Sequence, residues 1–175
     1  MSLPIPAGTY GIDAMHSQLG FSITHLGISI VRGTFDKYEG SLIVGASLAE
    51  TAVAIHAEMA SINSGNAMRD GHMHGDDFFD VANHPTMSFQ STSIEESDSG
   101  YSMTGDLTIK GITHSVTLAA DYNGSEVFPM DQSTHFGFAA RGTISRSAFG
   151  VSYGVAMVSD DVKLTLDVQF VKPAG

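Results

Sequence analysis

The sequence feature that most constrains this fold is a strict alternation of apolar and polar residues near the C-terminus. From Val162 through Leu166 to Phe170, every even position is apolar and every odd position is polar. Successive side chains of a β-strand point to opposite faces, so this period of two predicts a strand with one buried face. Similar alternation recurs within residues 19–25, 53–59, 103–109, 116–122 and 136–144. Together these runs predict an all-β protein.

Turn-forming residues separate the alternating runs. The pair Lys110-Gly111 lies between two of them, which predicts a tight hairpin. The later runs follow one another without a helical spacer, so neighbouring strands are expected to pair in antiparallel fashion. About eight such strands favour a closed antiparallel barrel, because closure removes exposed strand edges. A β-sandwich is the competing architecture, since alternation alone does not separate the two.

Residues 66–83 differ from the rest of the chain, because their apolar residues have a loose helical spacing. Asn66 is placed to cap the first turn of a helix, and Asp70 complements the helix dipole. Gly71 and Gly75 weaken the helix, and Pro85 is expected to end the segment. The sequence therefore predicts one short helix packed against the barrel.

Length and charge limit the classes of function. The chain has 175 residues, so residues 1–175 are expected to form a single domain. Its 19 Asp and Glu outnumber its eight Lys and Arg, which gives a formal net charge of −11. Binding to phosphate backbones requires clustered basic residues, so we expect no nucleic-acid partner, and the same repulsion weakens docking on an anionic bilayer.

The composition and the N-terminal segment exclude some kinds of site and bear on the cellular location. The chain has no cysteine, which excludes disulfides, thiolate metal sites and a cysteine nucleophile. We expect no stable membrane insertion, because no run reaches the ~18 apolar residues that span a bilayer. The N-terminus lacks a basic segment followed by an apolar core, so a cytoplasmic location is expected, or a periplasmic or secreted one if a signal peptide was removed.

A series of motifs occurs in a defined order along the chain. They are residues 10–17 (YGIDAMHS), 61–66 (SINSGN), 77–80 (DFFD), 105–113 (GDLTIKGIT) and 146–150 (RSAFG). Together they resemble the YceI-like family of lipid-binding proteins, over about residues 10–171. The resemblance implies an extended eight-stranded antiparallel barrel of lipocalin-like architecture, with a helix packed against it. Gly71 and Gly75 depart from the good helix formers expected in that helix.

The resemblance also implies a function, namely binding, storage or transport of a long-chain isoprenoid lipid in an elongated apolar tunnel. A polyprenol, a polyprenyl phosphate and an isoprenoid quinone are all candidate ligands. No enzymatic activity and no cofactor are expected. The mechanism would be sequestration, in which the chain leaves water for the tunnel while the head group stays near one mouth.

Strand parity and the resemblance together select candidate residues for the tunnel wall. Taken alone, the alternating apolar faces favour a filled core; with the resemblance, a lipid tunnel becomes the better interpretation. The nine methionines suit such a tunnel, because flexible thioether side chains adapt to irregular apolar ligands. The candidate lipid-binding residues are Phe21, Ile23, Phe35, Ile55, Met87, Phe89, Leu107, Phe136, Phe138, Phe149 and Leu166.

Polar residues within the motifs are candidates for contact with a head group. His16, His25 and Arg146 are the residues selected, although a structural hydrogen bond is the simpler role for either histidine. Only eight residues are basic, so a neutral or weakly polar head group suits the chain better than a pyrophosphate.

A His-based metal-dependent hydrolase is the alternative function. His72 and His74 lie two residues apart beside Asp76 and Asp77, and imidazole and carboxylate groups are zinc ligands. Side chains at i and i+2 of a helix diverge, however, so metal binding would require a loop there. We assign no metal site from the sequence. A plain interaction module with a packed core is a third interpretation, and the sequence leaves a homodimer open.

Overall fold

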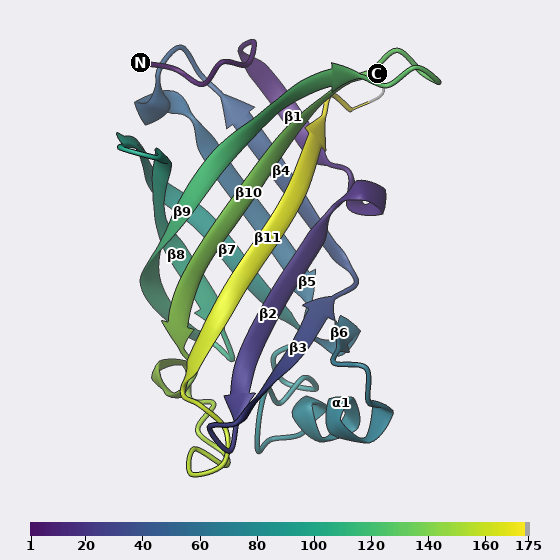
Figure 1. Ribbon diagram of the computed structural model, residues 1–175, viewed down its shortest axis with the longest axis vertical. Coiled ribbons are helices and arrows are strands. Elements are labelled where there is room, and N and C mark those ends of the chain that lie inside the picture. Colours follow the sequence, from purple (N-terminus) through teal and green to yellow (C-terminus); the bar gives the residue numbers. More distant parts are fainter. Residues whose placement is uncertain (174–175) are drawn as a thin grey trace.

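The computed structural model describes residues 1–173, whose antiparallel strands close into an eight-stranded barrel (Figure 1). The strands are β1 (Gly8–Ile12), β2 (Gln18–His25), β3 (Ser29–Phe35), β4 (Tyr38–Val44), β5 (Ala52–Glu58), β6 (Ile62–Asn63), β7 (Thr86–Ser97), β8 (Gly100–Ile109), β9 (Ile112–Val127), β10 (Thr134–Ser145) and β11 (Asp161–Val171). The helices are α1 (Ala67–His74) and the 3₁₀ turns η1 (Ala14–His16), η2 (Leu48–Glu50), η3 (Met59–Ser61) and η4 (Ser147–Phe149). The predicted barrel with one short α-helix is confirmed, and the β-sandwich alternative is wrong.

Some barrel strands are interrupted and count as two segments each, so eleven segments build eight barrel strands. β1 and β2 follow one another along the same edge of β11, where Ile12 pairs with Phe170 and Leu19 pairs with Leu166. In the same way β3 and β4 lie beside β2 and β1, while β6 and β5 lie beside β3 and β4. From β7 to β11 each strand pairs with the next in sequence. The barrel is therefore an antiparallel meander whose last strand closes onto its first.

The hairpin between β8 and β9 is the one that the sequence predicts. Ile109 pairs with Ile112, and the two residues between them, Lys110 and Gly111, have φ angles of 52° and 74°. Positive φ at both central residues is the turn geometry whose twist matches that of the flanking strands. Glycine adopts this conformation without strain, which explains its place in the turn.

Aromatic side chains pack the half of the barrel nearer the N-terminal segment, which we call the upper half (Figure 1). The rings of Tyr10 and Phe136 meet edge to face, with their centroids 5.2 Å apart. Buried aromatic side chains remove large apolar areas from water, so these contacts stabilise the closed barrel. The aromatic cluster comprises Tyr10, Tyr122, Phe136, Phe138 and Phe170.

The N-terminal segment covers this upper end. Leu3 and Ile5 are buried in the core, and the backbone N–H of Leu48 donates to the carbonyl of Met1 at 2.9 Å. The hydroxyl of Tyr10 donates to the carbonyl of Pro6 at 2.7 Å. The upper end of the barrel is therefore closed by packed side chains and by hydrogen-bonded chain.

The helix α1 lies at the opposite, lower end (Figure 1). The side chain of Asn66 accepts a hydrogen bond from the backbone N–H of Arg69 at 2.9 Å, so Asn66 is the cap that the sequence predicts. The helix ends at Gly75, and the chain continues through turns rather than as helix to residue 83. No helix formed by residues 1–173 is both long enough and apolar enough to cross a membrane.

Gly71 lies inside α1, and a Cβ atom built there would meet no atom within 4 Å. Alanine loses less backbone entropy than glycine when a helix forms, so Gly71→Ala is expected to raise the free energy of unfolding by about 0.5–1 kcal/mol. Urea denaturation followed by circular dichroism measures this change. Gly105→Ala is the opposing control, because its Cβ would lie 2.6 Å from the carbonyl oxygen of Gln90 and should lower stability. A loss of stability in Gly71→Ala would contradict the prediction.

Candidate functional site

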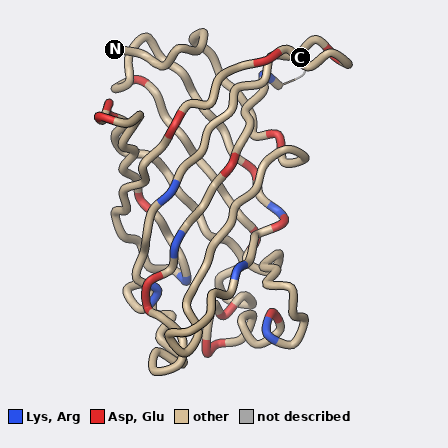
Figure 2. The backbone as a smooth tube through the Cα atoms, in the orientation of Figure 1, with Lys and Arg blue, Asp and Glu red and all other residues tan. Residues whose placement is uncertain are grey.

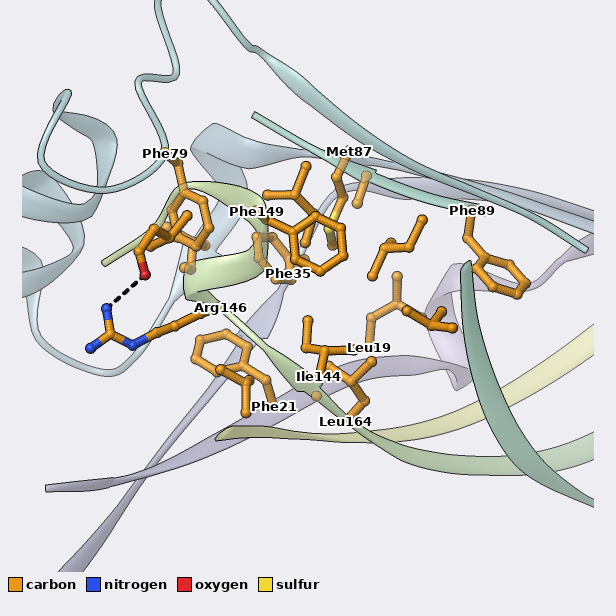
Figure 3. Close-up of a pocket in the computed structure, with 18 of the residues that line it drawn as sticks. Leu19, Phe21, Phe35, Phe79, Met87, Phe89, Ile144, Arg146, Phe149 and Leu164 are labelled. Carbon is orange, nitrogen blue, oxygen red and sulfur yellow. Dashed lines mark hydrogen bonds between the residues drawn. The ribbon is translucent and has the colours of Figure 1, made fainter. Parts of the chain in front are cut away.

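A cavity of about 170 Å³ lies within the barrel, and its lining reaches α1 at the lower end. Figure 3 shows side chains that line it. Its wall is formed by inward-facing side chains of β2, β3, β5, β6 and β7 to β11. Its floor is formed by α1, by the turns that follow α1, and by η4 with the loop after it. Among the described residues that line it, only Ser88 and Arg146 carry a side-chain oxygen or nitrogen. The space is therefore suited to an apolar molecule.

The inward residues along β10 become smaller toward the lower end of the barrel. Phe136 and Phe138 belong to the aromatic cluster, and the next inward positions are Ala140 and Gly142. The side chain of Leu118 fills the place beside Gly142, where its Cδ2 lies 2.6 Å from the position of a Cβ, and Leu118 itself lines the cavity. The lumen is packed around the two phenylalanines and hollow closer to the lower end.

Glycines on neighbouring strands keep large rings against the wall of the cavity. A Cβ atom at Gly33 would lie 2.4 Å from Cζ of Phe21, and one at Gly105 would lie 2.4 Å from Cζ of Phe89. Each ring therefore occupies the place that a side chain on the adjacent strand would take. A larger residue at either glycine would force the ring away from the wall, because atoms cannot approach so closely.

The structure brings most of the predicted lipid-binding residues together around this cavity. All but one of them lie on the apolar face of a strand, and this face points into the barrel; the exception is Phe149, which lies in η4. The residues that line the cavity are Phe21, Ile23, Phe35, Ile55, Met87, Phe89, Leu107, Phe149 and Leu166.

Phe136 and Phe138 do not line the cavity, and their placement in its wall is corrected. Phe136 is buried against Tyr10, and Phe138 packs between Tyr122 and Phe170. Strand parity gives the correct direction for both rings but not their depth along the barrel axis. Neighbouring aromatic residues from β1, β9 and β11 fill the lumen at that depth.

The floor of the cavity is the part that sequence reasoning missed. Met73, Phe78 and Phe79 come from α1 and the turns after it, whereas Val151 and Val158 come from the loop between η4 and β11. These segments have no strand alternation, so parity could not select them. For Met73, Phe78 and Phe79, the loose helical spacing of apolar residues within 66–83 was the one sequence signal that they pack against the barrel.

Arg146 anchors the loop that contributes to this floor. Its guanidinium donates to four backbone carbonyls, those of Val151, Tyr153, Val158 and Ser159, at 2.8–3.0 Å. A guanidinium has five N–H groups, so one is left for any other partner. Burial lowers the pKa of Arg146 from its usual value, and Asp160 opposes this effect. The residue lines the cavity, as expected for a head-group candidate, but its hydrogen bonds give it a structural role.

Asp160 ties down the other end of the same loop. Its carboxylate accepts hydrogen bonds from the Ser145 hydroxyl and, at 2.9 Å, from the backbone N–H of Ser147. These partners, Ser145 first and Ser147 next, lower the pKa of the Asp160 carboxyl below its usual value. The loop between η4 and β11 is therefore fixed at both ends by side-chain hydrogen bonds.

The other two head-group candidates lie outside the cavity wall. His25 is exposed at the end of β2, where it forms a backbone bridge with Val158. His16 lies in η1, where its Nδ1 is 2.6 Å from Oδ2 of Asp13, and it borders a separate hollow near Phe128. The structure does not bring the three head-group candidates together, because η1 and the lower loops belong to different parts of the barrel.

The histidine-rich segment gives no support to a metal centre. His72 and Asp77 are hydrogen bonded, with Nε2 and Oδ2 3.0 Å apart, and the His72 ring contacts Phe78 and Tyr153 at centroid distances of 5.0 Å. Within residues 1–173, no group of three or more His, Asp or Glu side chains is arranged to bind a metal ion. The three rings instead connect the α1 segment to the loop after η4 across the lower end.

Comparison with known proteins gives consistent matches over nearly the whole chain. The sequence model of the YceI-like domain family matches residues 10–170. A UPF0312 protein of Staphylococcus aureus is 37% identical over 165 residues, which cover 92% of both chains. The solved Campylobacter jejuni YceI protein is 32% identical and superimposes with a TM-score of 0.76, over 87% of this chain and 91% of that one. A polyisoprenoid-binding domain from Saccharophagus degradans shares the fold, with a TM-score of 0.70 at 16% identity over 94% of this chain and 98% of that one.

Replacing Arg146 tests its role as an anchor. Arg146→Met leaves four backbone carbonyls without their donor, so the free energy of unfolding is expected to fall by about 3 kcal/mol. Arg141→Met is the matched control, because Arg141 is exposed and pairs with Asp121 on the surface, where the loss should stay below about 1 kcal/mol. Urea denaturation measures both. Equal losses in the two variants would contradict the anchoring role.

The lowered pKa of Asp160 predicts a specific dependence of stability on pH. A carboxylate with a depressed folded-state pKa contributes stability that is fully present above its unfolded pKa of about 3.9 and is lost as the pH falls through the folded value. Asp160→Asn should therefore be less stable than the parent protein at neutral pH, and this difference should shrink below about pH 4. Urea midpoints of both proteins across this range provide the measurement. A difference that does not change with pH would disprove the assignment.

Proposed function

The chain belongs to the YceI-like family, and on that premise we propose that its cavity binds the hydrocarbon chain of an isoprenoid lipid. The observation that carries the proposal is the apolar wall of the cavity. Among the described residues that line it, Arg146 is the one with a charged side chain, and it already donates to four backbone carbonyls. An apolar chain gains about 25 cal/mol for each Å² that it removes from water, whereas a charged substrate would lose its hydration there without a partner.

The methionines of the wall support this proposal. Met73, Met87 and Met103 line the cavity from α1, β7 and β8. Unbranched thioether side chains adapt to irregular apolar surfaces, including the branched methyl groups of an isoprenoid chain. The Saccharophagus degradans neighbour, a polyisoprenoid-binding domain, agrees with a ligand of this class.

The entry direction follows from the two ends of the barrel. The aromatic cluster and the N-terminal segment close the upper end, so the chain would enter through the lower end, past the segments that form the floor of the cavity, with its tail toward Phe138. The head group would then stay near the loop that Arg146 anchors. One remaining N–H of Arg146 suits a hydroxyl or a quinone oxygen better than a phosphate, so we favour a polyprenol or an isoprenoid quinone.

Storage or transport by sequestration fits this geometry, since the cavity encloses the apolar chain and offers no group placed for chemistry. The family name and the names of the three relatives give no enzymatic activity. Nothing in residues 1–173 favours the hydrolase alternative over lipid binding, because the histidines near α1 are engaged with Asp77 and with aromatic rings.

Blocking the cavity tests the proposed function. Leu166 points into the cavity, whereas Thr165 is exposed on the opposite face of β11. Leu166→Trp should weaken polyprenol binding by at least about tenfold, because the larger side chain takes the space of the ligand. Thr165→Trp, the matched control, should bind as the parent protein does. Native mass spectrometry with polyprenols of increasing length measures both.

The ligand itself provides a second measurement. Mass spectrometry of gently purified protein is expected to detect a bound lipid with an isoprenoid chain. If neither this experiment nor direct titration detects such a lipid, or if both tryptophan variants bind equally, the proposed function is wrong.

A further inference from the structure

Four large apolar side chains are exposed beside the lower end of the barrel. Leu26 and Ile28 lie in the turn between β2 and β3 and are 54% and 84% exposed, while Val155 and Met157 lie in the loop after η4 and are 55% and 50% exposed. We call these four residues the apolar tip. Exposed apolar groups that gather in one place mark a surface that binds a partner, because their exposure to water is unfavourable.

Backbone hydrogen bonds join the two segments into one surface. The N–H of Leu26 donates to the carbonyl of Met157 at 2.7 Å, and the N–H of Ser159 donates to the carbonyl of Thr24 at 2.9 Å. The anchoring of this loop by Arg146 fixes it further. The apolar tip is therefore a defined feature of the fold and not two independent loops.

The two segments of the apolar tip also contribute residues to the cavity. Val158 lines the cavity directly after the exposed Met157, and Ile23 lines it three residues before the exposed Leu26. The apolar tip and the cavity therefore belong to the same end of the barrel.

The charge distribution indicates which partner suits this tip. Residues 18–31 and 147–159 contain no Asp, Glu, Lys or Arg, although the chain has 19 acidic and eight basic residues. Figure 2 shows both segments in tan, the colour of residues other than Lys, Arg, Asp and Glu, at the lower end. An uncharged apolar surface can enter the interface of a bilayer without moving a charge out of water. The net charge of −11 opposes approach to anionic lipids and also to a second copy of the same chain.

We propose that the apolar tip docks reversibly on the surface of a zwitterionic phospholipid bilayer. Docking places the lower end of the cavity against the acyl chains, so an isoprenoid lipid can move between the bilayer and the cavity without crossing water. The transfer step rests on the proposed lipid-binding function, whereas the docking step does not. Docking at this tip is peripheral, and it requires no membrane-spanning element.

A single fluorescent label tests the docking directly. The chain has no cysteine, so Ile28→Cys carries one environment-sensitive dye in the full-length protein. Phosphatidylcholine vesicles without any isoprenoid lipid should shift its emission to the blue. Met130→Cys is the matched control, because Met130 is 85% exposed in the loop between β9 and β10, away from the lower end, and its label should not respond. Equal responses at the two sites, or none at Ile28, would overturn the proposal.

Introducing negative charge at the apolar tip gives an independent measurement. The double variant Ile28→Asp with Met157→Asp should co-float with these vesicles at least about tenfold less than the parent protein, while Met130→Asp should be unchanged. Both replaced side chains are exposed, and thermal unfolding checks that the barrel is intact. A dimer that the tip variant disrupts, together with no vesicle binding by the parent protein, would assign the surface to a second copy and overturn membrane docking.

Isoprenoid-loaded vesicles then separate the two proposals. Transfer of a polyprenol to the parent protein, but not to the tip variant, is the expected result. Docking without any polyprenol in the protein would leave the docking inference standing and refute the lipid-binding function. Equal transfer to both proteins would support the lipid-binding function and refute docking through the apolar tip.

Discussion

The pairing of β11 with β1 and β2 is the constraint on which the rest of the structure depends. The last strand meets the first through the pairs of Ile12 with Phe170 and Leu19 with Leu166, and these contacts close the ring. Closure satisfies the backbone groups that an open edge would leave unpaired. It also turns one face of every strand inward, which creates a lumen whose contents depend on the residues at those positions.

Aromatic side chains fill one half of that lumen, and the other half keeps a cavity with an apolar lining. The aromatic cluster stabilises the barrel by removing ring surface from water, whereas the glycines beneath Phe21 and Phe89 let those two rings lie against the wall of the cavity. Stability and binding are thus separated along the barrel axis. The upper half behaves as a packed core, and the lower half keeps an apolar cavity beside loops that the hydrogen bonds of Arg146 and Asp160 fix in place.

Arg146 links the cavity to the outer surface of the lower end. Its four hydrogen bonds fix the loop that contributes Val158 to the cavity and Met157 to the apolar tip. Because the guanidinium of Arg146 is engaged with backbone carbonyls, its presence in the lining is consistent with a site for an uncharged apolar chain. The same anchoring presents exposed apolar side chains in a fixed arrangement, which a bilayer interface can accept.

The sequence by itself determined the strand content, the Lys110-Gly111 hairpin, the Asn66 cap and the apolar strand faces to which residues such as Leu107 and Leu166 belong. Each of these depends on local geometry, because period-two alternation, turn conformation and capping involve residues close in the chain. Only the tertiary structure decided that Phe136 and Phe138 pack while Phe89 borders a cavity, that Arg146 binds carbonyls, and that His16 and His25 lie apart. These outcomes depend on strand register and on neighbours distant in sequence, and no local pattern encodes which side chains meet at a given depth in the barrel.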